Sequence, residues 1–480
     1  MENKSVWRGS AVRYPSIEAG DRETVVIGGG IAGFLCAYFL AEAGQKVTLI
    51  EADRLFSGTT SLTTAKITYN QGSVYADLFM RYGRGVAELY YKSQTEAMEK
   101  YSELVEKYGI DCDFEETDGF IFSRNDSRAL KKTCELLQSF GAKCGLCNNV
   151  DYFNAAVALK AEGQYVFDPL KFLSALPVEF EIFENSRAID VDPKTKLIKT
   201  DGGFIKAEKI IIATHYPIIN SRGGYYFKLR QSTSYTVAVN GKRANAAYLD
   251  EKEDGISIRP YRDGTILGGG DHRTGRSKEC GRFKKLEKTA KELFGGEALN
   301  CWHAEDVMTF DGMPMAGRYS KTAQDVYVVT GFNKWGMTNA LVCAQVIRDL
   351  ILGKENPYAN LFSPQRKIKG AAGEIVSNAF TNLKEIFLGY FRITFKSARK
   401  IKSGSGKVVF VNGKKRAVYR DGKNNLHIIG SMCPHMHGEL KWNGDAERWE
   451  CPCHGSQFDI HGNLLSGPST KCCKYKNAHL

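Results

Sequence analysis

Three cysteines and three histidines lie within the 22 residues from Cys433 to His454. Four of them form two short pairs, Cys433-x-His435 and, after fifteen further residues, Cys451-x-x-His454. Thiolates and imidazoles in such pairs are typical metal ligands. Two sites fit this set: a structural zinc ion held by two cysteines and two histidines, or a [2Fe–2S] cluster with the cysteines on one iron and the histidines on the other. The spacing alone leaves both open.

A second chemical signal lies near the start of the chain, where Gly28, Gly30 and Gly33 satisfy the pattern G-x-G-x-x-G. The pattern follows the apolar run TVVI, opens the apolar stretch FLCAYFLAEAG, and Glu51 stands 23 residues after Gly28, at the end of KVTLI. This context predicts a strand–turn–helix–strand unit that binds a dinucleotide. The glycines permit a tight turn and close backbone approach, the helix N-terminus receives the pyrophosphate, and Glu51 accepts hydrogen bonds from a ribose.

The stretch from 311 to 340 favours FAD as the dinucleotide. It contains DGMPMAGR, the apolar run VYVVT, the glycine-rich turn GFNKWG and the helical pattern MTNALVCAQVIRDLIL. A second helix N-terminus beside a flavin ring would stabilise the negative charge of the reduced flavin.

Residues 22–350 resemble the D-amino-acid-oxidase-like family of FAD oxidoreductases, which includes the glycine and sarcosine oxidases. The matching segments are VVIGGGIAGFLCAYFLAEAGQKVTLIEA, IIIATHYP, DGMP and TGFNKWGMTNA. The resemblance implies an α/β FAD-binding Rossmann-like domain interleaved with an α+β substrate domain. It also implies a noncovalent FAD, a small amine or amino-acid substrate, and FAD contacts at Gly28, Gly30, Ile31, Ala32, Gly33, Glu51, Thr64, Ala65, Gly331, Lys334, Trp335, Gly336 and Met337.

The resemblance also indicates candidates for the substrate pocket. Lys66 would lie beside the flavin ring, although a surface cation is an equal alternative. Tyr235 and His272 lie on strands that wall the pocket in the family, with ordinary core or surface polar residues as the plainer interpretation. Oxidases of the family commonly bind the substrate carboxylate through an arginine, and three arginines are candidates here: Arg230, Arg259 and Arg273.

The surroundings of the cysteine–histidine pairs favour iron over zinc. CPHMHG and CPCHGSQFD resemble the two cluster-binding boxes of Rieske proteins, and SGPS at 466–469 resembles their proline loop. The resemblance implies that Cys433, His435, Cys451 and His454 hold a Rieske [2Fe–2S] cluster. High-potential relatives join the boxes by a disulfide. That bond cannot form here because Gly438 stands opposite Cys453, so Cys453 is expected to be a free thiol. Ser456 stands where a hydroxyl donates to a cluster sulfur.

The length of the chain and the changes in its sequence pattern predict several domains. A chain of 480 residues is longer than a single hydrophobic core usually accommodates. We expect the FAD-dependent oxidoreductase region at 1–362, a helical and basic linker at 363–402, and an all-β Rieske domain at 403–480. Within the first region, residues 77–140 look mainly helical and 164–270 mainly β-rich. The turns Asn412-Gly413 and Asp421-Gly422 predict hairpins in the last domain.

The linker carries an amphipathic helix candidate followed by a basic segment. Its apolar residues are expected to pack on the flavin domain, with a membrane surface as the alternative: Phe380, Leu383, Phe387 and Phe391. Residues 396–416 contain eight basic residues and no acidic ones, which indicates a solvated face or a docking site for an acidic electron carrier.

Composition excludes some classes of function. The net charge is +12, but no basic stripe interleaved with aromatic residues indicates nucleic-acid binding. No run of 18 apolar residues indicates a transmembrane segment, and the first residues lack the apolar core of a signal peptide. Thirteen cysteines then indicate a reducing compartment, the cytoplasm. Cys144 and Cys147 are expected to be structural thiols, and Cys472 and Cys473 have no predicted role.

Together these signals predict a two-electron to one-electron converter, because a flavin accepts a hydride and a [2Fe–2S] cluster carries single electrons. The leading hypothesis is a dehydrogenase that oxidises a small amine or amino acid and passes electrons through the cluster to an external one-electron carrier. A reductase running in the opposite direction, or a redox sensor without turnover, remains open. The segment ILGGGDHRTG lacks a following apolar helix, which argues against a second dinucleotide-binding unit for NAD(P)H.

Overall fold

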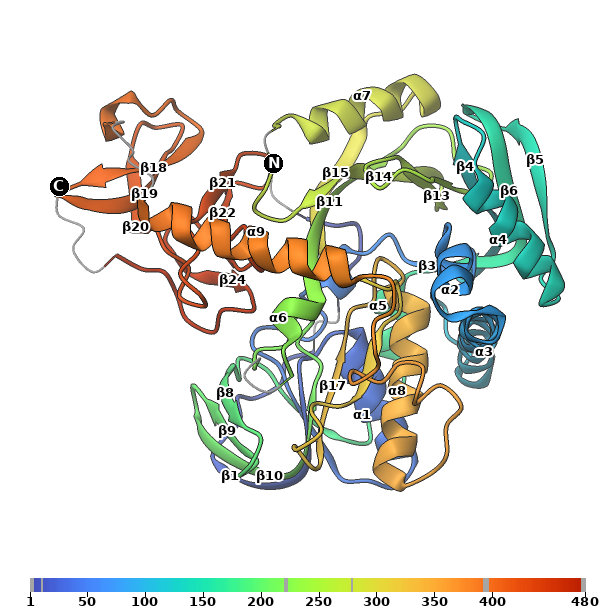
Figure 1. The fold of residues 1–480 in the computed structure, drawn as a ribbon, viewed down its shortest axis with the longest axis horizontal. Helices are drawn as coiled ribbons and strands as arrows, with labels where there is room; N and C mark the ends of the chain where they lie inside the picture. The colour runs from blue at the N-terminus through green and yellow to red at the C-terminus, as the bar shows by residue number, and fades with distance from the viewer. Residues whose placement is uncertain (1–3, 10–11, 220–222, 278, 392–396, 476–480) are drawn as a thin grey trace.

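The computed structural model describes residues 4–9, 12–219, 223–277, 279–391 and 397–475. Figure 1 shows a lower part built on one sheet, an upper part built on a second sheet, and a C-terminal module at the left. Helix α9 (Ala372–Phe391) crosses the front of the molecule toward that module. The predicted fold class, an α/β flavin-binding fold with a small all-β module, is confirmed.

The first sheet contains the predicted dinucleotide-binding unit. Its strands are β1 (Gly20–Ile27), β2 (Val47–Ile50), β7 (Glu181–Phe183), β8 (Ala188–Asp192), β9 (Leu197–Thr200), β10 (Gly203–Ile212), β16 (Met315–Arg318) and β17 (Val326–Thr330). The main order is β16-β17-β10-β1-β2-β7, and β1 runs parallel to both β10 and β2. Strands β2 and β17 and the last residues of β1 and β10 are buried on both faces and have continuous apolar sequences rather than alternating ones.

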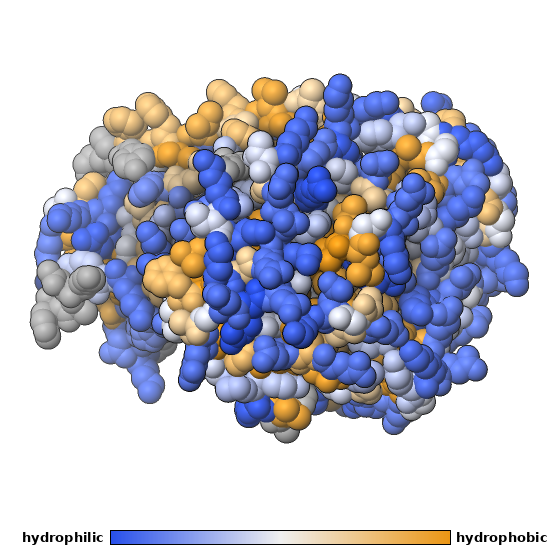
Figure 2. Space-filling view, turned by 90° about the horizontal axis from the view of Figure 1, so that it is seen from below, coloured by the Kyte–Doolittle hydropathy of each residue, from blue (hydrophilic) through white to orange (hydrophobic). Residues whose placement is uncertain are grey.

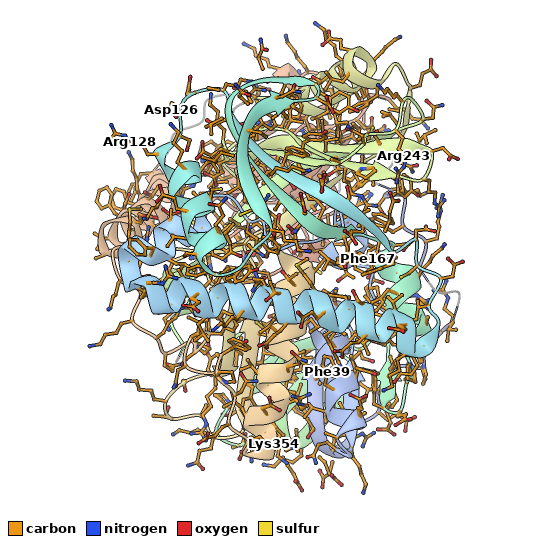
Figure 3. All side chains as sticks on the ribbon, turned by 90° about the vertical axis from the view of Figure 1, so that its right-hand side faces the viewer. Phe39, Asp126, Arg128, Phe167, Arg243 and Lys354 are labelled. Carbon is orange, nitrogen blue, oxygen red and sulfur yellow. The ribbon has the colours of Figure 1, made fainter. Side chains whose placement is uncertain are left out.

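Two apolar helices, α1 (Ile31–Glu42) and α8 (Gly336–Leu352), cover one face of this sheet. Both meet the long helix α3 (Arg84–Tyr108). Side chains of all three belong to one hydrophobic core. Figure 3 shows α3 lying across the molecule, with Phe39 of α1 below it and Phe167 above. The helices therefore join the lower part to the upper part.

The second sheet carries most of the remaining strands. They are β3 (Lys66–Ile67), β4 (Glu115–Ser123), β5 (Cys144–Val150), β6 (Phe153–Val166), β11 (Leu229–Val239), β12 (Ala247–Asp250), β13 (Ser257–Tyr261), β14 (Gly264–Arg273) and β15 (Ala298–Thr309). The order is β15-β11-β14-β13-β12-β4-β6-β3, with β5 paired to β6. Shorter elements surround it: η1 (Thr59–Leu62), α2 (Val74–Tyr82), α4 (Arg128–Ser139), α5 (Pro169–Ala175), α6 (Tyr225–Lys228) and α7 (Arg282–Phe294).

The mainly helical pattern expected for 77–140 is interrupted by β4. Thr117, Gly119 and Ile121 are buried while the residues between them are partly exposed, which is the alternation of a strand. Pairing with β6 and β12 fixes this conformation. The acidic residues at the start of β4 obscured the alternation in the sequence.

The C-terminal module consists of two small antiparallel sheets. They contain β18 (Ser405–Val411), β19 (Lys414–Arg420), β20 (Leu426–Gly430), β21 (Lys441–Asn443), β22 (Arg448–Glu450), β23 (Gln457–Phe458) and β24 (Leu464–Ser466). Asn412 and Gly413 both have positive φ, as the predicted two-residue turn requires. Asp421 and Gly422 lie instead in a longer loop, closed by a hydrogen bond from Asp421 N to Asn425 O.

The expectation that the apolar side chains of α9 pack on the flavin domain is wrong. Phe380, Leu383, Phe387 and Phe391 are all mostly exposed, whereas Asn378 and Asn382 on the opposite face are buried. Asn378 and Asn382 lie inward because the Arg273 guanidinium there donates hydrogen bonds to both side chains. Among the described residues, no helix has both the length and the apolar character needed to cross a membrane.

Candidate functional site

The glycine-rich loop between β1 and α1 accepts no larger residue at its two tightest points. Gly28 has a φ of +111°, and a Cβ there would lie 2.5 Å from the Ala213 carbonyl oxygen. A Cβ on Gly33 would lie 1.9 Å from the Gly28 carbonyl oxygen. Gly30, the N-cap of α1, has no side chain with which to cap the helix, and the Ile31 N–H donates to the Thr60 hydroxyl at 2.9 Å. The following N–H groups of Ala32 and Gly33, in the first turn of the helix, are in the position that receives a pyrophosphate.

Glu51 ends β2 directly beside this loop. Its carboxylate accepts hydrogen bonds from the Gly29 N–H at 2.6 Å and the Asp53 N–H at 2.9 Å. Burial raises the pKa of Glu51, and the two backbone donors oppose that shift. In this structure Glu51 braces the loop.

A cavity of about 530 Å³ lies between the two sheets, beside the N-termini of both α1 and α8. The predicted FAD residues that line it are Gly30, Ile31, Ala32, Thr64, Gly331, Lys334, Trp335, Gly336 and Met337, together with the pocket candidate Lys66. Four other predicted FAD residues do not line the cavity: Gly28, Gly33, Glu51 and Ala65. A cavity of this size beside two helix N-termini fits a flavin dinucleotide, and the lining residues would hold it.

Charged groups gather on the wall opposite the glycine loop. The Lys334 ammonium lies 2.8 Å from Asp271, and Lys66 Nζ donates to the Ser257 hydroxyl. Burial lowers the pKa of Lys66 to about 8, and burial raises the pKa of Asp306 to about 7. Such shifts bring both groups close to neutral pH, where proton transfer is most effective. The sequence did not single out Asp306.

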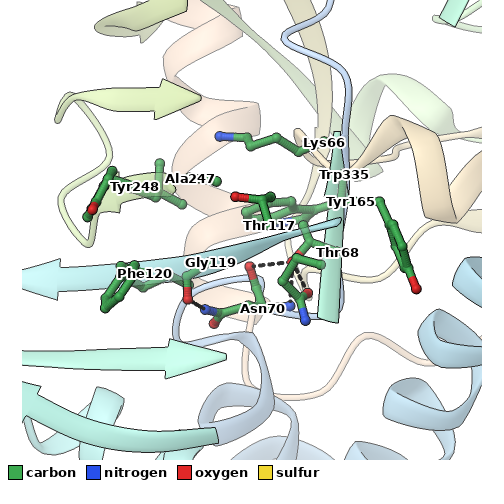
Figure 4. A pocket seen from close by; sticks show the side chains of 13 residues that line it. Lys66, Thr68, Asn70, Thr117, Gly119, Phe120, Tyr165, Ala247, Tyr248 and Trp335 are labelled. Atoms are coloured by element: carbon green, nitrogen blue, oxygen red, sulfur yellow. Dashed lines mark hydrogen bonds between the residues drawn. The ribbon is translucent and has the colours of Figure 1, made fainter. Parts of the chain in front are cut away.

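A smaller cavity of about 20 Å³ shares Lys66 and Trp335 with the large one. Figure 4 shows Lys66 above it and the hydrogen bond from Asn70 Nδ2 to the Gly119 carbonyl below. It has room for about one water molecule. Lys66 therefore separates the main cavity from a small internal one.

The structure separates the other pocket candidates. Ser234 and Thr236 of β11 line the cavity, so Tyr235 between them points to the opposite face of the sheet. There its hydroxyl lies 3.1 Å from His272 Nε2 and receives a hydrogen bond from Asn443 of the C-terminal module. Neither Tyr235 nor His272 lines the cavity, which corrects the expected placement.

The three candidate arginines also have different surroundings. Arg230 lines the cavity, 3.2 Å from Glu253. Arg259 is buried and donates to backbone carbonyls of Thr64 and Ala65, so it supports the chain beside the cavity. Arg273 points toward α9. Only Arg230 is in position to meet a ligand in this cavity.

The predicted metal ligands come together in two loops of the C-terminal module. Cys433 and His435 lie between β20 and β21, and Cys451 and His454 lie between β22 and β23. The Cys433 thiol lies close enough to Cys451 for the pKa of Cys433 to be raised by it, and the imidazole centroids of His435 and His454 are 5.1 Å apart. Burial lowers the pKa of both imidazoles, so they are neutral, as ligands must be.

An iron–sulfur cluster fits these donors. The Nδ1 atoms of His435 and His454 are buried and have no hydrogen-bond partner, which is costly unless a metal accepts them. In the described residues, no group of three or more His, Cys, Asp or Glu side chains is close enough for a single ion. A [2Fe–2S] cluster divides its four ligands between two irons. The Ser456 hydroxyl is buried beside these loops and accepts a hydrogen bond from the Ser469 N–H at 3.0 Å, and its donation to a cluster sulfur stays a prediction.

The second cysteine of the second box has no partner for a disulfide. A Cβ added at Gly438 would lie 2.7 Å from Cys453 Sγ, so the glycine leaves this side chain its space. Cys453 is a free thiol in the structure. Cys473 is buried against the carbonyls of Gly430 and Met432, and Cys144 lies beside Cys134.

One pair of adjacent residues connects the cavity to the cluster loops. His215 follows β10 and lines the cavity, while the ring of Tyr216 lies 6.4 Å from that of His454, measured between centroids. Tyr226 contacts the same imidazole at 6.3 Å. Both residues belong to the segment IIIATHYP, and no role was predicted for either, although ligands commonly bind where parallel strands end.

Strand β14 makes a second connection. Asp271 lines the cavity, and Arg273, two residues later, donates to the Cys453 carbonyl at 3.4 Å. The Gly275 N–H then donates to Glu450 of β22 at 2.8 Å, in a contact too close for a Cβ. The wall of the cavity is therefore also the base on which the cluster loops rest.

A buried ion pair fixes the C-terminal module to the second sheet. Arg448 lies 3.5 Å from Glu305 and also contacts His303 and Gln457, and all four are buried. Burial alone would raise the pKa of Glu305, but Arg448 and His303 hold it well below its ordinary value. The carboxylate is thus ionised and depends on its cation.

The sequence matches two family models. Residues 23–350 match the FAD dependent oxidoreductase family (DAO), and residues 392–476 match the Rieske [2Fe-2S] domain. YhfW of Bacillus subtilis (strain 168), named for a Rieske 2Fe-2S centre, is 29% identical over 98% of this chain and 97% of its own length. The cytochrome b6-f complex iron-sulfur subunit of Prochlorococcus marinus is 28% identical over 25% of this chain and 64% of its own.

Solved structures show the same fold for the first two parts. Glycine oxidase from Geobacillus kaustophilus has a TM-score of 0.62 at 18% identity and covers 72% of this chain and 99% of its own. L-proline dehydrogenase from P. horikoshii has a TM-score of 0.61 at 20% identity, covering 73% and 98%. These findings agree with both halves of the site, and the chain belongs to the DAO family of FAD-dependent oxidoreductases and carries a Rieske [2Fe–2S] domain.

Proposed function

We propose that this protein is a dehydrogenase for a small amine or amino acid, and that its electrons leave through the Rieske cluster to an external one-electron carrier. The single observation behind this proposal is the shared wall: His215 faces the cavity and its neighbour Tyr216 faces the cluster ligand His454. When both cofactors are bound, FAD takes the hydride and the cluster carries the two electrons onward singly.

The polar groups of the cavity suit an amine that also carries a carboxylate. Oxidation to the imine breaks one C–H and one N–H bond and releases two electrons and two protons. Arg230 is a cation on the cavity wall that can bind the carboxylate. Lys66, with a pKa of about 8, can accept the proton from the substrate nitrogen. The names of similar structures, a glycine oxidase and an L-proline dehydrogenase, favour the same substrate class.

The reverse direction is the second candidate, because the shared wall would carry electrons either way. A reductase would need an outside donor for the cluster and would leave the flavin oxidised when only an amine is added.

Free cysteines support a reducing compartment, the cytoplasm, since the described residues contain no disulfide.

The test uses the full-length protein purified without oxygen, with iron and zinc measured on the same sample. After dithionite reduction, a Rieske-type EPR signal with two irons per chain is expected. Amines and amino acids are then screened for bleaching of the flavin absorbance followed by the EPR signal. The matched control Cys433→Ser should bleach with the same substrate and give no EPR signal.

Three results would overturn the proposal. One zinc and no iron would remove the electron path. A substrate that bleaches the flavin while the cluster stays oxidised, with one peroxide formed per substrate when oxygen is then admitted as the acceptor, would make the protein an oxidase. Reduction of the flavin by a pre-reduced cluster, with no bleaching by any amine, would support the reductase instead.

A further inference from the structure

The outer face of α9 carries an exposed apolar row, here called the α9 stripe. It consists of Val376, Phe380, Leu383, Phe387 and Phe391, each between 63% and 68% exposed. Their spacing of four, three, four and four residues puts them on one side of the helix. Figure 1 shows α9 at the front, and Figure 2, seen from below, shows hydrophobic side chains gathered along the margin on that side.

The helix cannot turn this row inward without breaking its anchoring contacts. Arg273 donates to Asn378 and Asn382 on the inner face, and Asn382 also contacts His454. Lys415 donates to the Gly389 carbonyl near the end of the helix. An ordinary surface helix buries its largest apolar side chains, but α9 holds them outward and packs Asn378, Asn382 and Ile386 inward. An apolar row of this size that is held outward indicates an interaction surface.

Exposed basic residues flank the stripe along the chain. Lys384 lies beside Leu383 on the helix and is exposed, while the two acids of α9 are paired, Glu374 with Arg81 and Glu385 with Lys441. Exposed basic residues precede and follow the helix in the chain: Lys367, Lys369, Arg399, Lys400 and Lys402. Residues 396–416 contain eight basic residues and no acidic ones.

We propose that the α9 stripe binds the surface of an anionic lipid bilayer. An interfacial helix lies flat with large apolar side chains in the boundary between headgroups and acyl chains, and basic residues beside it attract anionic headgroups. The charge pattern favours lipid over a second copy of this chain, because two such basic surfaces repel each other. The helix has 20 residues and can lie flat over about 30 Å of membrane.

This placement has a consequence for the cluster. Asn382 contacts His454 on the face opposite the stripe, so this expected cluster ligand would lie about one helix diameter, roughly 10 Å, from the lipid surface. A lipid-soluble electron carrier could then reach it. This consequence rests on the proposed function, whereas lipid binding itself does not.

The experiment is flotation of the full-length holoprotein with vesicles of phosphatidylcholine alone or mixed equally with phosphatidylglycerol. The test variant is Phe380→Ser/Leu383→Ser/Phe387→Ser, and the matched control is Phe204→Ser/Leu299→Ser, whose side chains are 53% and 56% exposed on other elements. Each large apolar side chain contributes about tenfold to partitioning. The test variant should therefore bind anionic vesicles at least about a hundredfold more weakly than wild type.

The proposal requires that wild type and control float with anionic vesicles, that they float less with neutral ones, and that salt weakens the difference. Unchanged flavin and iron content will show that the surface substitutions leave the fold intact. Wild type that floats with neither vesicle, or a test variant that floats as well as wild type, would overturn lipid binding. Sedimentation of a wild-type dimer that the test variant loses, without flotation, would assign the stripe to self-association. None of these outcomes depends on turnover.

Discussion

Removing Arg448 tests how the Rieske domain is held on the flavin domain. The substitution Arg448→Met keeps much of the side-chain length and removes the cation that lies 3.5 Å from Glu305. Glu305 is 5% exposed, so water cannot replace the lost partner. Breaking a buried ion pair in this way costs about 3–5 kcal/mol, because a charge stays buried without compensation.

Hydrogen exchange measures this cost at the interface itself. A loss of about 3–5 kcal/mol should lower amide protection in β15 and β22 by about a hundredfold to several thousandfold. Amides of β1 and β2, far from the pair, should keep their protection. In wild type, the stability from Glu305 is present above its unfolded pKa, near 4.5, and is lost as pH falls, since its folded pKa is depressed. In Arg448→Met that acid-induced loss should disappear.

The double variant Arg448→Met/Glu305→Gln is the control. Without the uncompensated charge, it should recover most of the protection, to within about 1 kcal/mol of wild type. If Arg448→Met alone changes protection less than tenfold, or if the double variant is no better than the single one, the ion pair is not what anchors the domain.

Three further predictions concern the two sites. Gly33→Ala should abolish flavin binding, since its Cβ would lie 1.9 Å from a loop carbonyl, whereas Gly85→Ala, with open space around its Cβ, should keep full flavin absorbance. Lys66→Met should remove a rise in stability with pH between about 8 and 10.5. The depressed pKa of Lys66 means that the unfolded state binds more protons in that window, and urea midpoints against pH will show whether the rise persists. Gly438→Cys should form a disulfide with Cys453, because the added Cβ lies 2.7 Å from its sulfur; equal thiol counts in oxidised and reduced samples would contradict this.

Local signals in the sequence predicted the parts of the fold whose conformation is determined by residues adjacent in the chain. The strand–loop–helix unit around Gly28 and the hairpin at Asn412 follow from backbone geometry that only a few residues permit. For the cluster loops, spacing indicated a metal site, and the resemblance of CPHMHG and CPCHGSQFD to Rieske boxes indicated a cluster rather than zinc. These features depend on short segments, which can be found without knowledge of the tertiary structure.

The sequence could not show which side of a buried strand faces which cofactor. Tyr235 alternates with Ser234 and Thr236, and only the docked Rieske domain decides that Tyr235 meets Asn443 rather than the cavity. The amphipathic pattern of α9 was correctly identified, but its orientation depends on Arg273 of a distant strand. Likewise, the position of Tyr216 beside His454 could not be predicted, because the two residues are far apart along the chain.

If the proposed function is right, the flavin and the cluster exchange electrons within one chain. Flash photoreduction of the flavin in the anaerobic full-length protein, with the cluster absorbance followed in time, measures this exchange. We expect first-order reduction of the cluster at a rate independent of protein concentration. A rate proportional to protein concentration, or a flavin that stays reduced beside an oxidised cluster, would contradict it.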